Sequence, residues 1–168
     1  MSLYVFGYGS LINMSENKEL NLKKKRRVCP VMINGLKRAF NVASSSSGKY
    51  KVLGVKNTKD ADKKCNGILI QIDREKELAA LLKREANYIP KEVDLARIRF
   101  PYNKTLTFQP GDKVVCFYPQ AKFTLTQQAS KQVNLRPNYL TICLTGAAKF
   151  GKDFLTDFIA TTPELAKH

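Results

Sequence analysis

A chain of 168 residues, 43% hydrophobic and 26% charged, has the length and composition of one globular domain, which excludes long disordered or low-complexity proteins. Its 29 Lys and Arg residues outnumber its 14 Asp and Glu residues, and the net charge of +15 favours anionic partners without identifying one. No apolar stretch reaches the ~18–20 residues of a membrane span, and the N-terminus lacks the pattern of a secretory signal. We therefore expect a cytoplasmic protein that makes no membrane contact.

Short strands are predicted in the first half of the chain. Residues 3–8 alternate as in a strand, and Gly7 and Gly9 end it in a turn that continues to Leu11. The dipeptide Asn34-Gly35 is typical of hairpin turns, and the stretch from Ser44 to Lys49 is predicted to be a flexible loop. Strands are expected at residues 3–8, 28–33, 37–42, 50–55 and 65–72.

The second half of the chain adds the helices. Asp73 is a candidate N-cap for a helix through about Ala86, and Pro90 prevents its continuation. Further strands are expected at 92–100 and, after a turn at 109–112, at 113–118, and further helices at 138–148 and 153–161, separated by Gly151. The pattern predicts a mixed α/β (α+β) fold in a single domain over residues 1–168.

An unbroken basic run, Lys23 to Arg27, precedes the strand at residue 28. It is interpreted either as a solvated connector or as a contact for nucleic acid or an anionic membrane surface. The sequence has no helix-turn-helix pattern, zinc-finger spacing, aromatic RNA-binding motif or GXXG loop, so nucleic acid is not the partner we expect.

The inventory of reactive side chains excludes several kinds of catalysis. The single histidine, His168, is the last residue, where chain ends fray, so catalytic sites of the Ser-His-Asp or Cys-His type and histidine zinc sites are not expected. The four cysteines form no C-x-x-C pair and lie in apolar stretches, which predicts reduced structural thiols and no metal site. An enzyme of this composition would work with carboxylates, tyrosines, lysines or backbone amides.

Glu85 is the candidate reactive carboxylate. In the predicted helix, Leu78, Leu81 and Leu82 form the apolar stripe, and the direction of Glu85 falls between those of Leu81 and Leu82. Burial raises the pKa of a carboxyl group toward neutrality, where it can both take and give a proton. The alternatives are a structural ion pair with Arg97 or Arg99, or a helix end that frays into solvent.

The turn from Tyr8 to Leu11 is the second candidate feature. Successive backbone N–H groups after a strand, with glycines that permit a positive φ, form an anion-binding nest. A carboxylate or phosphate could bind there without a charged side chain, but the same residues also suit an ordinary Gly-Ser turn.

Together these residues resemble the γ-glutamylcyclotransferase-like superfamily, which includes the ChaC proteins. The resemblance covers nearly the whole chain, and its segments occur in the family's order. They are Phe6-Gly7-Tyr8-Gly9-Ser10-Leu11, Gly35-Leu36-Lys37-Arg38-Ala39-Phe40-Asn41, Leu53-Gly54-Val55, Cys65-Asn66-Gly67-Ile68-Leu69, Arg84-Glu85 with Tyr88, and Tyr139 through Gly146-Ala147, Gly151, Phe154 and Thr161-Thr162. Tyr88 follows Glu85 by three residues rather than the four of ChaC proteins, which is closer to other branches of the superfamily.

The resemblance implies a small closed mixed β-barrel flanked by helices, and cofactor-free cyclisation of a γ-glutamyl group to 5-oxoproline with release of the attached amine or peptide. Glu85 matches the family's general base and acid. The backbone amides of Tyr8, Gly9, Ser10 and Leu11 match the segment that holds the γ-glutamyl group. Tyr88 and Tyr139 are further candidate pocket residues.

The partner implied by the resemblance is a small γ-glutamyl compound: glutathione, a γ-glutamyl amino acid or a γ-glutamylamine. Two alternatives stay open. One is a catalytically silent binding module of the same fold, and the other is a basic protein that binds nucleic acid or a membrane surface through Lys23 to Arg27.

Overall fold

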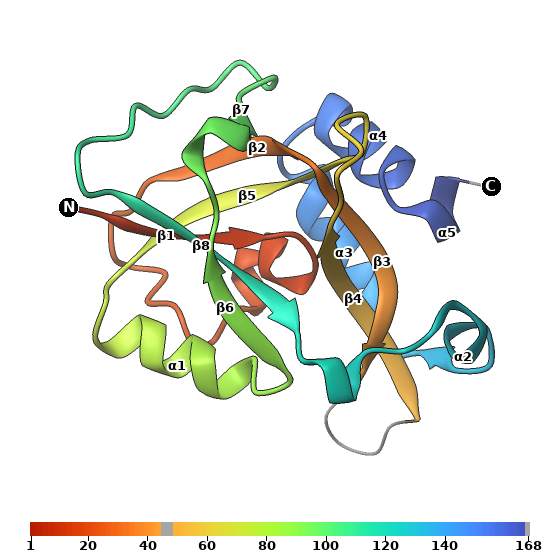
Figure 1. The fold of residues 1–168 in the computed structure, drawn as a ribbon. Helices are drawn as coiled ribbons and strands as arrows, with labels where there is room; N and C mark the ends of the chain where they lie inside the picture. Colours follow the sequence, from red (N-terminus) through yellow and green to blue (C-terminus); the bar gives the residue numbers. More distant parts are fainter. Residues whose placement is uncertain (45–48, 167–168) are drawn as a thin grey trace.

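The computed structural model describes residues 1–44 and 49–166 (Figure 1). Residues 45–48, which make up most of the predicted serine-rich loop, and His168 lie outside the described part of the chain. The described strands form a six-stranded sheet and a three-stranded sheet. In the order of the larger sheet they are β6 (Tyr88–Glu92), β8 (Lys113–Pro119), β1 (Leu3–Gly7), β5 (Lys64–Ile72), β2 (Val28–Asn34) and β7 (Ile98–Arg99), and in the smaller sheet β3 (Leu36–Ala43), β4 (Tyr50–Asn57) and β9 (Asn134–Leu135).

Strand β1 lies inside the larger sheet, between β5, to which it is antiparallel, and β8, to which it is parallel. All five of its residues are buried, because other elements cover both of its faces. The turn that follows β1 therefore starts from a rigid, fully buried strand.

The predicted hairpin at Asn34-Gly35 is wrong, although the strands on both sides of it are present. Strand β2 pairs with β5 and β7 in the larger sheet, whereas β3 pairs with β4 in the smaller one. Gly35 has a φ of 73°, a left-handed conformation that glycine adopts without strain. This corner carries the chain from one sheet to the other instead of folding it back on its own strand.

The closed barrel implied by the family resemblance is also corrected. The described strand pairings leave two open sheets, since no pairing joins the end strands β6 and β7 of the larger sheet. Strand β7 has only two residues, and β6 contains Pro90, which has no N–H to donate and is tolerated at a sheet edge. The predicted strand at 92–100 is mostly wrong, because the Asp94 side chain accepts a hydrogen bond from the Ala96 N–H and caps a short 3-10 turn, Leu95–Arg97.

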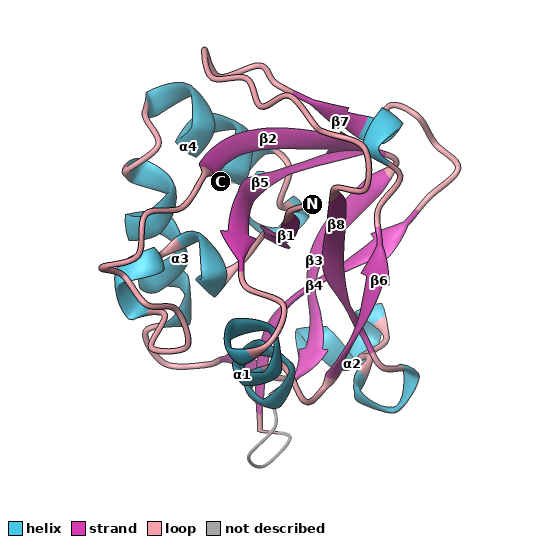
Figure 2. Cartoon of the chain, turned by 90° about the vertical axis from the view of Figure 1, so that its left-hand side faces the viewer, coloured by secondary structure: helices cyan, strands magenta, loops and turns pink. Residues whose placement is uncertain are grey.

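The described helices are α1 (Lys76–Arg84), α2 (Gln127–Lys131), α3 (Tyr139–Ala148), α4 (Lys152–Ala160) and α5 (Pro163–Ala166). Helix α3 packs on α4 and on the turn after β1, and α4 contacts β5, so both cover one side of the sheets (Figure 2). Helix α1 lies apart from them (Figures 1 and 2). None of the helices in the described part of the chain is long and apolar enough to span a bilayer.

Candidate functional site

The residues selected from the sequence come together around one cavity of about 110 Å³. It lies where the turn after β1, the end of α1, the smaller sheet and the start of α3 meet. Its lining consists of Tyr8, Gly9, Ser10, Leu11, Ala43, Ser44, Val52, Leu53, Arg84, Glu85, Asn87, Tyr88, Phe117, Arg136 and Tyr139. A second hollow, of about 480 Å³, lies between the basic run and residues 104–109, but no acid or tyrosine lines it. The smaller cavity is therefore the candidate functional site.

The turn after β1 needs its glycines for close packing. The predicted positive φ is wrong, since Gly9 has a φ of −134° and the glycines with positive φ in the described chain lie elsewhere. A Cβ atom at Gly9 would lie 2.6 Å from Tyr139 Oη, and one at Gly7 would lie 2.9 Å from Leu11 Cβ. A short 3-10 helix, Ser10–Ile12, follows, and the N–H groups of Ser10 and Leu11 donate to no described backbone carbonyl.

Arg38 is hydrogen-bonded to this turn from the interior of the protein. Its guanidinium is fully buried, stacks on the Phe158 ring at 3.9 Å, and Nη1 donates to the Tyr8 carbonyl at 3.0 Å. Its other acceptors are Asn66 O, Asn66 Oδ1, Phe158 O, Thr161 Oγ1 and Thr162 Oγ1. Through these six hydrogen bonds Arg38 links the turn to β5, to α4 and to the two threonines that follow α4.

The three cavity tyrosines are engaged with the main chain. Tyr8 Oη donates to Phe117 O at 2.6 Å, and Tyr88 Oη donates to Leu53 O at 2.8 Å. Tyr139 Oη accepts from the Leu53 N–H at 3.2 Å. Burial raises the pKa of all three hydroxyls, so they remain neutral and serve as walls of the cavity rather than as bases.

Glu85 lies just beyond helix α1 rather than within it. Its N–H still bonds to Leu81 O at 2.8 Å, but its ψ of 44° ends the helix and turns the chain into β6. The Glu85 side chain points toward the interior, as expected, although the apolar stripe of α1 differs from the predicted one. Leu81 is fully buried, whereas Leu82 is 41% exposed.

The proposed structural pairing of Glu85 with Arg97 or Arg99 does not occur. Arg97 donates to Asn34 O and Gly35 O, and Arg99 donates to Ala96 O. The charge nearest to the Glu85 carboxylate is instead that of Arg84, whose Nε lies 3.5 Å from Glu85 Oε1.

The Glu85 carboxyl is electrostatically suited to exchange a proton. Its side chain is 15% exposed, and burial raises its pKa, with Glu19 adding to the rise and Arg84 and Arg136 opposing it. Arg84 compensates only in part, because its guanidinium also bonds to Asn17, Glu19 and Ser10 Oγ. No described group donates a hydrogen bond to the Glu85 carboxylate, so its oxygens are available to a ligand.

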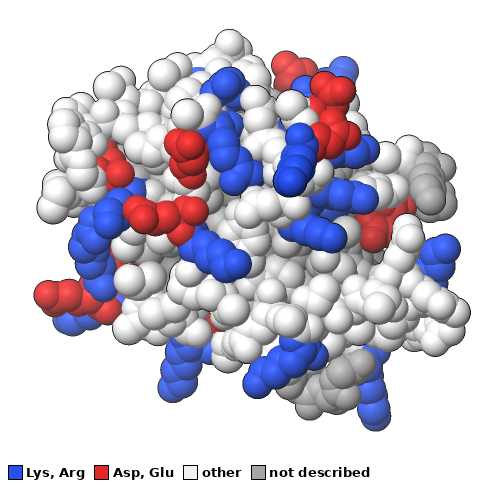
Figure 3. Space-filling model, in the orientation of Figure 1, with Lys and Arg blue, Asp and Glu red and all other residues white. Residues whose placement is uncertain are grey.

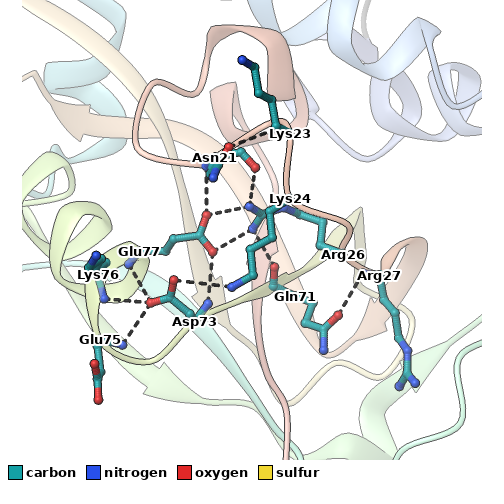
Figure 4. Close-up of polar contacts among 10 residues, drawn as sticks. All are labelled: Asn21, Lys23, Lys24, Arg26, Arg27, Gln71, Asp73, Glu75, Lys76 and Glu77. Carbon is teal, nitrogen blue, oxygen red and sulfur yellow. Dashed lines mark hydrogen bonds and ion pairs between the residues drawn. The ribbon is translucent and has the colours of Figure 1, made fainter.

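The basic run helps to fix α1, and with it Glu85. Arg26 donates to both carboxylate oxygens of Glu77, at 2.9 and 2.6 Å, and each of the two side chains is 5% exposed (Figure 4). Lys24 lies 3.5 Å from Asp73, whose carboxylate accepts the first N–H groups of α1 (Figure 4). The interpretation of the run as a solvated connector is therefore wrong for Arg26.

The face drawn in Figure 3 shows no separate basic patch. On the face drawn in Figure 3, Lys and Arg side chains are spread over the surface, and Asp and Glu lie among them. Within residues 1–44 and 49–166, no group of three or more His, Cys, Asp or Glu side chains is placed to hold a metal ion. All four cysteines are free and buried.

Sequence reasoning missed six lining residues: the apolar Ala43, Val52 and Phe117 and the polar Ser44, Asn87 and Arg136. Asn87 is buried and donates from Nδ2 to Ala43 O at 3.0 Å, which ties the end of α1 to β3. Arg136 is exposed and lies between β9 and α3. Of the three polar residues, only Asn87 had a signal nearby, since it lies between the two motif residues Glu85 and Tyr88.

Comparison with known proteins gives matches among solved structures, whereas no protein-family model and no curated sequence matches the chain significantly. A γ-glutamyl cyclotransferase matches with a TM-score of 0.64 at 15% identity, over 96% of this chain and 88% of that one. An uncharacterized protein from Homo sapiens matches with a TM-score of 0.66 at 15% identity, over 95% and 88%. A γ-glutamyl cyclotransferase specific to glutathione from yeast matches with a TM-score of 0.61 at 16% identity, over 98% and 96%.

TM-scores of 0.64, 0.66 and 0.61 over nearly the whole chain are evidence of a shared architecture. The motif resemblance found in the sequence is thereby confirmed at the level of the fold. This chain has the γ-glutamyl cyclotransferase-like fold.

Proposed function

We propose that this protein is a cofactor-free γ-glutamyl cyclotransferase-type enzyme that converts a γ-glutamyl compound to 5-oxoproline and a free amine or peptide. The α-amine of the substrate attacks its own γ-carbonyl carbon and forms the ring C–N bond. The bond from that carbon to the leaving nitrogen then breaks. The α-ammonium nitrogen loses two protons in all, one before its attack and one as the ring closes. Glu85 takes each of them in turn and returns it to the leaving nitrogen, which departs as an ammonium group.

The observation that carries the proposal is the state of Glu85. Burial raises the pKa of the Glu85 carboxyl and brings it closer to physiological pH. A carboxyl group with such a pKa takes and gives protons more effectively. Its oxygens accept no hydrogen bond from a described group and line the cavity, whereas the three tyrosine hydroxyls there are bonded to the main chain. Glu85 is thus the group in this cavity best suited to move protons.

The rest of the cavity suits a reaction in which the substrate supplies the nucleophile. Folding the γ-glutamyl chain into a ring-closing pose can supply up to ~7–11 kcal/mol of the barrier, and a placed acid/base adds about 10²–10⁴-fold. The N–H groups of Ser10 and Leu11 would hold the γ-glutamyl group or the oxyanion of the tetrahedral intermediate. Arg38 keeps that turn in place through the Tyr8 carbonyl.

The experiment is a product assay for 5-oxoproline with glutathione, γ-glutamyl amino acids and γ-glutamylamines. Glu85→Gln keeps the size of the side chain and removes the titrating group, so turnover should fall by at least 100-fold. The matched control is Glu92→Gln, which removes an exposed carboxylate in β6 outside the cavity and should retain the rate. Unchanged turnover in Glu85→Gln would remove Glu85 from the mechanism, and ligand binding without product would favour the silent binding module.

A further inference from the structure

The main-chain N–H and carbonyl of Arg136 are both hydrogen-bonded. Its N–H donates to Lys51 O in β4 at 3.1 Å, and its carbonyl accepts from the Tyr139 N–H at 3.1 Å. Pro137 follows, with the restricted φ of proline, and Asn138 then takes a left-handed φ of 64°. The side chain of Arg136 therefore leaves from a fixed point at the cavity.

The guanidinium of Arg136 has no neutralising partner in the part of the chain that the structure describes. Within the described residues, no hydrogen bond or ion pair engages it, whereas Arg84 is bonded to Asn17, Glu19 and Ser10. It lines the cavity, and its charge opposes the rise that burial causes in the pKa of both Glu85 and Tyr88, as a cation facing the same space would. Because Arg136 is exposed and Glu85 largely buried, Arg136 lies toward the solvent side of the cavity.

A second polar group of the cavity also lacks a partner among residues 1–44 and 49–166. The Oγ atom of Ser44 is buried without a hydrogen bond, although buried hydroxyls nearly always have one. The Ser44 N–H bonds to Tyr50 O, and the Arg136 N–H bonds to the carbonyl of the next residue, Lys51. Ser44 and Arg136 thus flank the same end of β4, one on each side of it.

We propose that Arg136, assisted by Ser44, binds a carboxylate on the leaving group, so that the substrates are γ-glutamyl amino acids or peptides rather than γ-glutamylamines. This inference rests on the proposed function, in which Glu85 and the turn after β1 hold the γ-glutamyl part at the inner side. The leaving group then extends toward Arg136. A carboxylate on the leaving group gains charge-assisted hydrogen bonds from Arg136, whereas a leaving group that carries an ammonium group is repelled by it.

The test uses two substrates that differ in one group: γ-glutamylglycine, which ends in a carboxylate, and γ-glutamylglycinamide, which ends in a neutral amide. The native protein should show a kcat/KM at least tenfold higher for the acid. Arg136→Gln should lower kcat/KM for the acid by about tenfold or more, mainly through KM, and leave the amide within twofold. Arg136→Lys should restore part of the preference, because it keeps the charge but loses the forked geometry.

The matched control is Arg74→Gln, which removes the same charge from an exposed position outside the cavity and should leave both substrates unchanged. An equal loss for both substrates in Arg136→Gln would mean that Arg136 binds the α-carboxylate of the γ-glutamyl part, and it would overturn the inference. Equal rates for the acid and the amide in the native protein would also overturn it, with the proposed function intact.

A binding measurement separates the inference from catalysis. Calorimetry on Glu85→Gln compares the affinities for γ-glutamylglycine and γ-glutamylglycinamide, with and without Arg136→Gln. Arg136-dependent preference for the acid would support the leaving-group subsite even if no 5-oxoproline forms in any assay, in which case only the proposed reaction fails. If neither compound binds, the inference is overturned, and the proposed function is overturned as well if glutathione, the other γ-glutamyl amino acids and the γ-glutamylamines also give no 5-oxoproline.

Discussion

The Arg38→Lys variant tests whether the buried guanidinium stabilises the fold as its contacts indicate. Arg38 makes six hydrogen bonds from a fully buried position, and no carboxylate is among its partners. A lysine keeps the charge but has three N–H donors, so at least three of the six acceptors lose their bond. At about 1 kcal/mol for each lost bond, the free energy of unfolding should fall by about 3 kcal/mol. For a chain of this size that corresponds to roughly 6–12 °C in Tm.

The assay is urea unfolding followed by circular dichroism, with the slope of the transition checked for constancy. The matched control is Arg99→Lys, an exposed arginine whose replacement should change stability by no more than about 0.5 kcal/mol. A loss below about 1 kcal/mol for Arg38→Lys would refute the reasoning, because it would mean that water or local rearrangement satisfies the acceptors. Since Nη1 also holds the Tyr8 carbonyl, turnover of any γ-glutamyl substrate should fall with stability in this variant.

Three further predictions follow from the packing of the site and the core. The raised pKa of Glu85 means that the folded state binds this proton more tightly than the unfolded state, so stability falls as pH rises through and above the ordinary carboxyl range. Glu85→Gln should therefore be more stable than the native protein at pH 8 but not at pH 4. An equal stability difference at both pH values in urea unfolding would contradict this. Gly9→Ala should lose about 1–3 kcal/mol through the clash with Tyr139 Oη, and Tyr139→Phe in the same chain should recover part of that loss in a double-mutant cycle, whereas strict additivity would rule out the clash. The four cysteines are buried and burial raises their pKa, so a thiol reagent should label them only after unfolding, and rapid labelling of the native protein would show that the core opens.

The strands with continuous apolar runs are predictable from the sequence, and the partners of those strands are not. Residues 65–72 and 113–118 are expected as strands and occur as β5 and β8, extended by one residue at one end. The Asn34-Gly35 pair correctly marks a sharp turn, but a turn fixes only local direction. Which sheet receives the next strand depends on the burial of β2 between β5 and β7, a contact between distant parts of the chain.

The candidate site was predictable where a motif marks it and not where the fold alone assembles it. The periodicity of the leucines indicates that Glu85 faces inward, although α1 ends at Arg84, the residue before Glu85, and Leu82 is exposed. Arg136 and Ser44 belong to no motif, and hydrogen bonds to neighbouring residues of β4 bring them to the cavity. Most of the strand expected at 92–100 does not form, because the Asp94 carboxylate accepts a hydrogen bond from the Ala96 N–H. This local hydrogen bond stabilises a turn in competition with the extended backbone that the alternating pattern predicts.

The lining of the cavity comes from both sheets and from segments as distant as Tyr8 and Arg136. No part of the chain could form it alone, so a compound that fills it recognises the folded state and has little affinity for the unfolded one. By mass action, such a compound present at a hundred times its Kd raises the free energy of unfolding by about 2.7 kcal/mol. Melting curves recorded against a library of γ-glutamyl compounds would therefore rank substrates by affinity, independently of whether any of them reacts.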